Sequence, residues 1–165
     1  MLHRRSIRLK NYDYSRPGSY FVTICTHNKQ KLFGDIVNGQ MMLNEAGEFA
    51  KAGWLAIPQH YPDVALDKWV IMPDHIHGII WIKKSSANLM HHNRYQHIIP
   101  HSLGCIVRGF KIGVTKCMRE KFPGFVVWQR NYHEHIIRNE DELYLIRKYI
   151  KNNPVNWGDS MIGNG

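Results

Sequence analysis

Residues 64–83 read "VALDKWVIMPDHIHGIIWIK", two runs of apolar and β-branched residues separated by Pro73-Asp74. Runs of this length and composition are typical of strands, and a Pro-Asp pair between them is typical of a turn. The second run carries His75 and His77, and alternate residues of a strand lie on the same face about 6.6–6.8 Å apart. The sequence therefore predicts two imidazoles on one face of a stiff, largely buried strand.

The rest of the chain predicts further strands and helices around this pair. We expect strands at 20–26 and 125–137, a short hairpin at 31–43 around Asn38-Gly39, and helices at 44–59, 102–121 and 139–153. Without the hairpin the order is strand, helix, strand, strand, helix, strand, helix. This order predicts an α+β fold, a ferredoxin-like split βαβ antiparallel sheet with helices on one face and an additional C-terminal helix.

We interpret residues 1–165 as a single domain, with 1–19 as a basic N-terminal arm. The three cysteines are far apart and form neither a disulfide framework nor a CxxC zinc motif, which favours a reducing compartment. The amino terminus has no signal-peptide core, and the longest apolar run is interrupted well short of the roughly 20 residues of a membrane span. We therefore expect a soluble, cytoplasmic protein.

The charge balance is strongly basic, with 22 Lys and Arg against 13 Asp and Glu and a formal net charge of +9. Such an excess favours a polyanionic partner, nucleic acid first and an anionic membrane second. Each basic residue alone is more often solvated than in contact. Together, the following are predicted to form a phosphate track: Arg4, Arg5, Arg8 and Lys10 in the arm, Lys83, Lys84 and Arg94 around the loop, and Arg108, Lys111 and Arg119 on one helix.

The His-x-His pattern by itself carries no weight, because the chain has 11 histidines and a second such pair, His133 and His135. The second pair follows the polar residues "QRNY", so a solvated or substrate-facing strand end is expected there. Around His75 and His77 the residues are apolar, which suits fixed ligands for one divalent ion. The alternative for the first pair is one buried, hydrogen-bonded histidine and one accidental neighbour.

The last predicted helix carries Tyr149 and Asn153 four residues apart and therefore on one face. Alone, they would be an ordinary helix residue and an ordinary helix stop before Pro154. Two imidazoles, an amide oxygen and a phenol together fit a metal-assisted phosphoryl transfer in which a tyrosine oxygen attacks phosphorus.

Several segments also resemble a known family. "MPDHIHGIIWI" is similar to the HUH motif (His, bulky hydrophobic, His) of the single-tyrosine transposases. "YFVTICT", "FGDI", "VWQRNYHEHIIRNEDEL" and "YIKNNPVNW" resemble the REP-associated tyrosine transposases, a domesticated bacterial branch of that family. The resemblance covers roughly residues 6–157, with the motifs in the expected order.

The resemblance implies a ferredoxin-like catalytic domain that nicks and rejoins hairpin-bearing single-stranded DNA with Mg²⁺ or Mn²⁺. His75 and His77 match the metal-binding pair, Tyr149 the nucleophile and Asn153 the third ligand. Asp74 stands where many relatives have Asn, which leaves the ligand assignment intact. The resemblance to the insertion-sequence members implies a dimer with shared active sites and that to the REP-associated members a monomer, so a monomer and a homodimer are both open.

Two other functions remain open at this point. One is a catalytically silent nucleic-acid-binding module on the same fold, since this topology also serves RNA-recognition modules. The other is a metal-dependent phosphodiesterase that uses water and would not need Tyr149.

Overall fold

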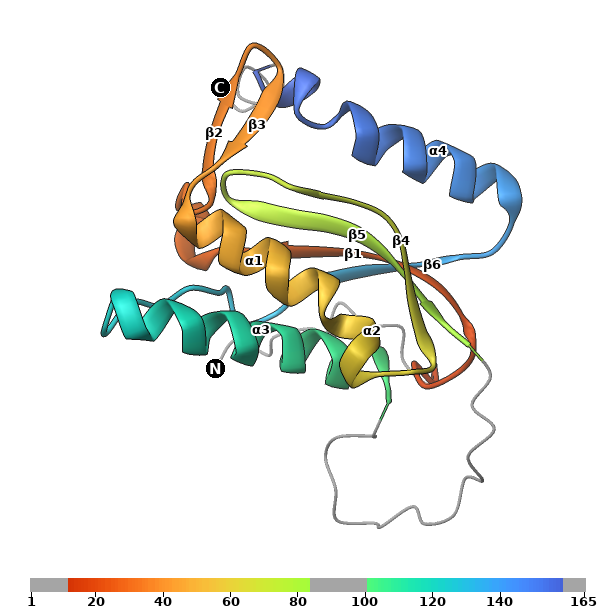
Figure 1. Ribbon diagram of the computed structural model, residues 1–165. Coiled ribbons are helices and arrows are strands. Elements are labelled where there is room, and N and C mark those ends of the chain that lie inside the picture. Colours follow the sequence, from red (N-terminus) through yellow and green to blue (C-terminus); the bar gives the residue numbers. More distant parts are fainter. Residues whose placement is uncertain (1–11, 84–100, 159–165) are drawn as a thin grey trace, which may run out of the picture.

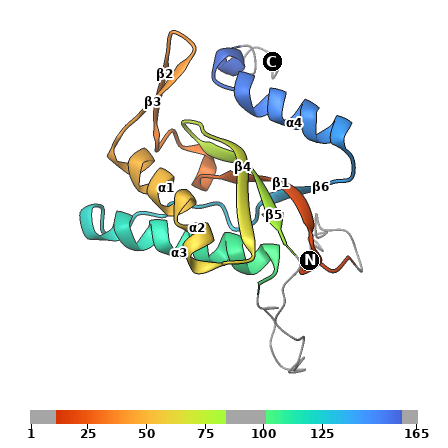
Figure 2. The same ribbon diagram turned by 45° about the vertical axis from the view of Figure 1, so that its right-hand side comes forward.

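The computed structural model describes residues 12–83 and 101–158, which form a four-stranded antiparallel sheet with helices on both faces (Figures 1 and 2). Its strands are β1 (Gly18–Cys25), β4 (Val64–Ile71), β5 (His75–Ile82) and β6 (His133–Ile137), in the spatial order β4-β5-β1-β6. Because β5 lies between β1 and β4, the two strands joined through the first helix are not neighbours. This is the split βαβ arrangement, so the predicted ferredoxin-like α+β fold is confirmed.

One face of the sheet is covered by α1 (Glu45–Leu55), α2 (Ile57–His60) and α3 (Leu103–Lys121), which lie on the same side in both views. Trp54 of α1 is fully buried, and its ring lies 5.5 Å from that of Phe110 on α3. Gly78 of β5 lies directly beneath Trp54, and a Cβ at this position would collide with the indole. The glycine after His77 therefore allows α1 to pack closely on the central strand.

The other face is covered by α4 (Glu140–Asn152), which is followed by the short 3-10 helix η2 (Val155–Trp157). Asn139 caps α4 by accepting a hydrogen bond from the Glu142 amide at 2.8 Å. A second, smaller core forms below the helix from Ile79, Ile137, Leu143 and Ile150. The additional C-terminal helix thus lies against the face that α1 and α3 leave open.

The predicted hairpin consists of β2 (Gly34–Val37) and β3 (Gln40–Leu43), with Asn38 and Gly39 as its two turn residues. Both have positive φ, 51° and 71°, the conformation that Asn-Gly favours in this kind of turn. The Cα of Gly39 faces Val155 of η2, so the hairpin tip packs against the end of the C-terminal helix (Figure 1).

The strand predicted at 125–137 is wrong for its first half, because only His133–Ile137 pair with β1. Residues 125–132 make one isolated bridge, between Trp128 and Thr26, and Val127 is buried. Lys111 of α3 reaches this segment and donates to the carbonyls of Gln129 and Asn131 at 2.8 and 3.3 Å. These carbonyls therefore have a side-chain donor in place of a neighbouring strand.

The helix predicted at 44–59 divides at Ala56 into α1 and α2. Asn44, the first residue of the predicted range, caps α1 by accepting from the Gly47 amide at 3.0 Å. Pro58 has no N–H to donate to the carbonyl of Trp54, so α1 ends here and α2 starts with proline in its first turn.

The predicted N-terminal arm is described only from residue 12. Tyr12 and Tyr14 pack against the main core, which lies between the sheet and helices α1 and α3. Strand β1 begins at Gly18, inside the range predicted as arm. Within residues 12–83 and 101–158, no helix is both long and apolar enough to cross a bilayer.

An ion pair ties α4 to the sheet. Arg147 donates to both oxygens of Asp67 on β4, at 2.9 and 2.6 Å, and the Trp81 indole donates to the same carboxylate at 3.1 Å. The Asp67 carboxylate is largely buried, and these donors, Arg147 first, lower its pKa from 3.8 to about 2. The pair holds the middle of α4 two residues before Tyr149.

We expect Asp67→Asn to lower the free energy of unfolding by about 1–2 kcal/mol at neutral pH. Because the folded pKa lies below the unfolded one, this contribution is complete above about pH 4 and is lost as the pH falls towards 2. Urea unfolding of both proteins from pH 7 to 2.5 measures the difference. A difference that stays constant over this range would contradict the ion pair, and Glu48→Gln, in the exposed pair with Lys51, is the matched control.

Candidate active site

His75 and His77 lie on the face of β5 that α4 covers, while Ile76 and Gly78 between and after them face the main core. Their ring centroids are 4.4 Å apart. The two imidazoles therefore lie side by side, as the strand periodicity predicts, on a central strand held on both sides by β1 and β4.

Each imidazole is fixed through its Nδ1 atom. His75 Nδ1 lies 2.5 Å from Asp74 Oδ1, and His77 Nδ1 lies 2.8 Å from Thr23 Oγ1 on the neighbouring strand. A carboxylate accepts, so the proton of this hydrogen bond lies on His75 Nδ1, and Nε2 is the nitrogen left to face a metal ion. Carboxylates and hydroxyls of this kind orient the histidines of metal sites, leaving Nε2 for the ion.

His77 is held in the neutral form. Its side chain is 6% exposed, and burial, together with the neighbouring His75, lowers its pKa to about 3. An imidazole must be neutral to bind a metal ion, so His77 can act as a ligand at any pH near neutrality without first losing a proton.

Tyr149 reaches the histidine pair from α4. Its hydroxyl oxygen lies 3.4 Å from His77 Nε2, and its ring contacts both His77 and Phe21, with centroids 5.3 and 6.1 Å away. The side chain is nevertheless 53% exposed, so the phenol is open to a large ligand. A partly exposed phenol oxygen and the Nε2 atom of a buried imidazole thus meet between α4 and the sheet.

Asn153 is the C-cap residue of α4, one turn after Tyr149, and is partly buried. Asn153, Pro154 and Gly158 all have right-handed helical backbone angles. Asn153 therefore lies between Tyr149 and Trp157 in the chain, where α4 passes into η2. These two aromatic residues contact the histidines, Tyr149 at His77 and Trp157 at His75.

The donor set suits a divalent cation. Among residues 12–83 and 101–158, no three His, Cys, Asp or Glu side chains gather as a metal site. Two imidazoles with Nδ1 already engaged offer nitrogen ligands for a divalent ion. Asn153, between Tyr149 and Trp157 in the chain, carries an amide oxygen of the kind that Mg²⁺ and Mn²⁺ accept. The residues fit the ion implied by the HUH resemblance, and the role of Asn153 stays a prediction.

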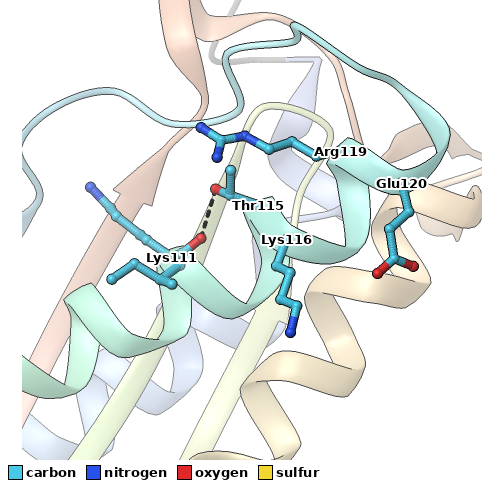
Figure 3. A pocket seen from close by; sticks show the side chains of 6 residues that line it. Lys111, Thr115, Lys116, Arg119 and Glu120 are labelled. Atoms are coloured by element: carbon cyan, nitrogen blue, oxygen red, sulfur yellow. Dashed lines mark hydrogen bonds between the residues drawn. The ribbon is translucent and has the colours of Figure 1, made fainter.

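The basic residues predicted on α3 to contact phosphate do not lie beside the histidines, because α3 covers the opposite face of the sheet (Figure 1). Lys111, Thr115, Lys116 and Arg119 line a groove on the outer side of α3 (Figure 3). Burial lowers the pKa of Lys111 to about 8, and its ammonium is used by the 129–131 carbonyls. Arg108 and Arg119 are exposed, so any contact they make with DNA lies on a second surface.

Of the other basic residues predicted to contact DNA, only Lys83 lies within the described part of the chain. Lys83 follows the end of β5 away from His75. Arg4, Arg5, Arg8, Lys10, Lys84 and Arg94 lie outside the described residues. Sequence reasoning missed two residues at the site itself, Trp157 and Lys31. The "NPVNW" segment was recognised only as a family motif, and nothing local in the sequence indicated that Lys31 would approach Trp157.

The second histidine pair is arranged differently. His133 and His135 lie on edge strand β6, paired with Thr23 and Phe21, and both are exposed. His135 Nε2 lies 3.4 Å from Glu142 Oε2 on α4. His133 is two strands away from His77, about 10 Å at the usual strand spacing. This arrangement favours the first pair as the ligand pair.

The chain is similar in sequence to two known proteins. An uncharacterised protein of Haemophilus influenzae is 49% identical over 162 residues, which cover 94% of this chain and 90% of that protein. Another protein of this organism, assigned to the REP-associated tyrosine transposases, is 30% identical over 156 residues, covering 91% of this chain and 78% of that protein. No protein-family model matches the chain.

Among solved structures, a REP-associated tyrosine transposase bound to a REP hairpin has the same fold. Its TM-score is 0.63 at 19% sequence identity, with 92% of this chain and 74% of that chain covered.

Proposed function

Because the chain belongs to the REP-associated tyrosine transposases, we propose that it is a metal-dependent, single-tyrosine HUH enzyme that nicks and rejoins hairpin-bearing single-stranded DNA. The observation that carries the proposal is the approach of the Tyr149 oxygen to 3.4 Å from His77 Nε2. A phenol beside two oriented imidazoles, exposed enough to receive a polynucleotide, is the constellation that a tyrosine strand transferase needs.

In the proposed reaction the Tyr149 oxygen attacks a backbone phosphorus. The O–P bond to tyrosine forms as the bond from phosphorus to the 3′ oxygen breaks; the tyrosine proton is lost and the departing 3′ oxygen gains one. The products are a 5′-phosphotyrosine and a free 3′-OH. Because the ester keeps the bond energy of the phosphodiester, a 3′-OH can attack it in the reverse direction and rejoin the strand.

His75, His77 and Asn153 are the residues proposed to hold Mg²⁺ or Mn²⁺. When bound, the ion would polarise the scissile phosphate and stabilise its developing charge. Asp74 and Thr23 hold the two imidazole rings through Nδ1, and Phe21 packs against both His77 and Tyr149. These contacts fix the rings and limit the motion of the phenol before DNA binds.

The proposed substrate follows from the relatives and from charge. The structurally similar transposase is bound to a REP hairpin, and the net charge of +9 favours a polyanion. We include the whole chain, residues 1–165, in one catalytic domain, with the basic residues 1–19 and the α3 surface as further contacts to the DNA backbone. Both a monomer and a homodimer are compatible with a site built within one chain.

A covalent-trapping experiment tests the proposal. Radiolabelled single strands carrying a REP hairpin with flanks on both sides are incubated with the protein and Mg²⁺ or Mn²⁺, then denatured and separated by electrophoresis. We expect labelled DNA to migrate with the protein, and a chelator to prevent this. Cut DNA without an adduct would indicate water as nucleophile, and tight binding without cutting would indicate the silent binding module.

A further inference from the structure

Trp157 stands at the end of the active site opposite Tyr149. The ring contacts run in the order Tyr149, His77, His75 and Trp157, with centroid distances of 5.3, 4.4 and 6.0 Å. The indole is tilted 31° from the His75 ring and is partly exposed. Part of the indole is therefore open to a ligand on the far side of the histidine pair from the phenol.

Residues from the hairpin and from the segment before it lie near the indole. Val155, two residues earlier, lies beside Gly39 at the hairpin tip. Lys31, from the segment between β1 and β2, places its ammonium 6.0 Å from the centre of the Trp157 ring. A flat aromatic group beside a positive charge is the combination with which proteins bind unpaired nucleotides, the ring stacking on the base and the cation lying near a phosphate.

The direction of the reaction decides which nucleotide would lie there. In an in-line displacement the attacking and leaving oxygens are on opposite sides of phosphorus. If Tyr149 attacks from the His77 side, the 3′ oxygen departs towards His75 and Trp157. The nucleotide that carries this oxygen is the one immediately 5′ of the cut.

We propose that Trp157 stacks on the base of the nucleotide that leaves with the 3′-OH, with Lys31 beside its phosphate. This inference rests on the proposed function, because it takes Tyr149 as the nucleophile. Its consequence is that the cut 3′ end stays next to the phosphotyrosine, in position to rejoin. The competing explanation is that Trp157 only shields His75 from water.

The test is a double-mutant cycle between the protein and the DNA. The Tyr149→Phe variant, which should bind without cutting, is titrated with a REP hairpin oligonucleotide whose cut site has been mapped with the wild type. One abasic site is placed either at the nucleotide 5′ of the cut or at the nucleotide 3′ of it. Affinity is then measured again after adding Trp157→Ala.

We expect the abasic site 5′ of the cut to weaken binding about 5- to 100-fold, and Trp157→Ala to weaken binding to the intact strand similarly. Combining the two should give little further loss, because both remove the same stack. Trp157→Phe should restore part of the affinity. Tyr144→Ala, which removes another exposed aromatic side chain from α4, should show no coupling to either position.

Independent, multiplying losses would overturn the inference and leave Trp157 as a shield for His75. Coupling to the nucleotide 3′ of the cut would overturn the assigned side. If the wild type forms no adduct and makes no cut, the proposed function fails separately. Abasic sites scanned through the flank then test stacking alone, and coupling to none of them overturns it.

Discussion

Replacing Tyr149 by Phe is expected to reduce formation of the protein–DNA adduct by about 1000-fold or more, below detection in a trapping gel. The change removes only the oxygen that would bond to phosphorus. The ring keeps its contacts with His77 and Phe21, and the hydroxyl makes only a long approach of 3.4 Å to His77, so stability should change by less than about 0.5 kcal/mol. DNA affinity, measured by anisotropy, should be retained.

Tyr144→Phe is the matched control for this experiment. Tyr144 is also on α4 and is 65% exposed. It lies about 140° around the helix from Tyr149. We expect adduct formation at the wild-type level. An adduct that persists in Tyr149→Phe but disappears in Tyr144→Phe would reassign the nucleophile. Cleavage without an adduct in Tyr149→Phe would identify the protein as a phosphodiesterase that uses water.

The parts of the fold that the sequence predicted correctly depend on local chemistry. Asn38-Gly39 forms the expected turn because both residues accept positive φ. The capping side chains of Asn44, Ser102 and Asn139 each bind an amide of the first helical turn, so those helix starts could be read directly. The pairing of β4 with β5 across Pro73-Asp74 likewise followed from apolar runs and a turn.

The parts that failed depend on tertiary contacts. The apolar residues 125–128 read as a strand, yet the chain there packs along α3 and its later carbonyls are satisfied by Lys111. The positions of Arg108 and Arg119 on α3 were correct within the helix, but the sequence does not say which face of the sheet a helix covers. Trp157 and Lys31 are 126 residues apart in the sequence and approach each other only in the folded chain.

The candidate site, too, could be predicted only where it depends on local periodicity. Strand periodicity placed His75 and His77 on one face, and helix periodicity placed Tyr149 and Asn153 on one side of α4. That these two surfaces face each other depends on how α4 packs on the sheet, through Ile79, Ile150 and the Asp67–Arg147 pair. From the sequence, only the resemblance to the HUH motif implied that Tyr149 and the histidine pair belong to one site.

The second large effect concerns the histidines. We expect His75→Ala and His77→Ala each to abolish adduct formation and to weaken Mn²⁺ binding by at least about 100-fold, measured by calorimetry without DNA. Each change removes a ligand from a pair whose rings are 4.4 Å apart, and the remaining ligands cannot hold the ion as tightly. DNA affinity measured in the presence of a chelator should stay within a few-fold of wild type, since neither imidazole is expected to bind the DNA strand directly.

Two further variants show whether the loss belongs to this pair. Asp74→Asn keeps a hydrogen-bonding group beside His75 Nδ1 but removes the charge, so Mn²⁺ affinity should fall only about 10- to 100-fold. His133→Ala, on the edge strand, should leave Mn²⁺ binding unchanged. Because His77 is buried and its replacement can lower stability, His75→Ala, at a more exposed position, is the decisive variant. If His133→Ala removed Mn²⁺ binding while His75→Ala kept it, the ion would belong to the edge strand, and Tyr149 would face a pair of histidines with a structural role only.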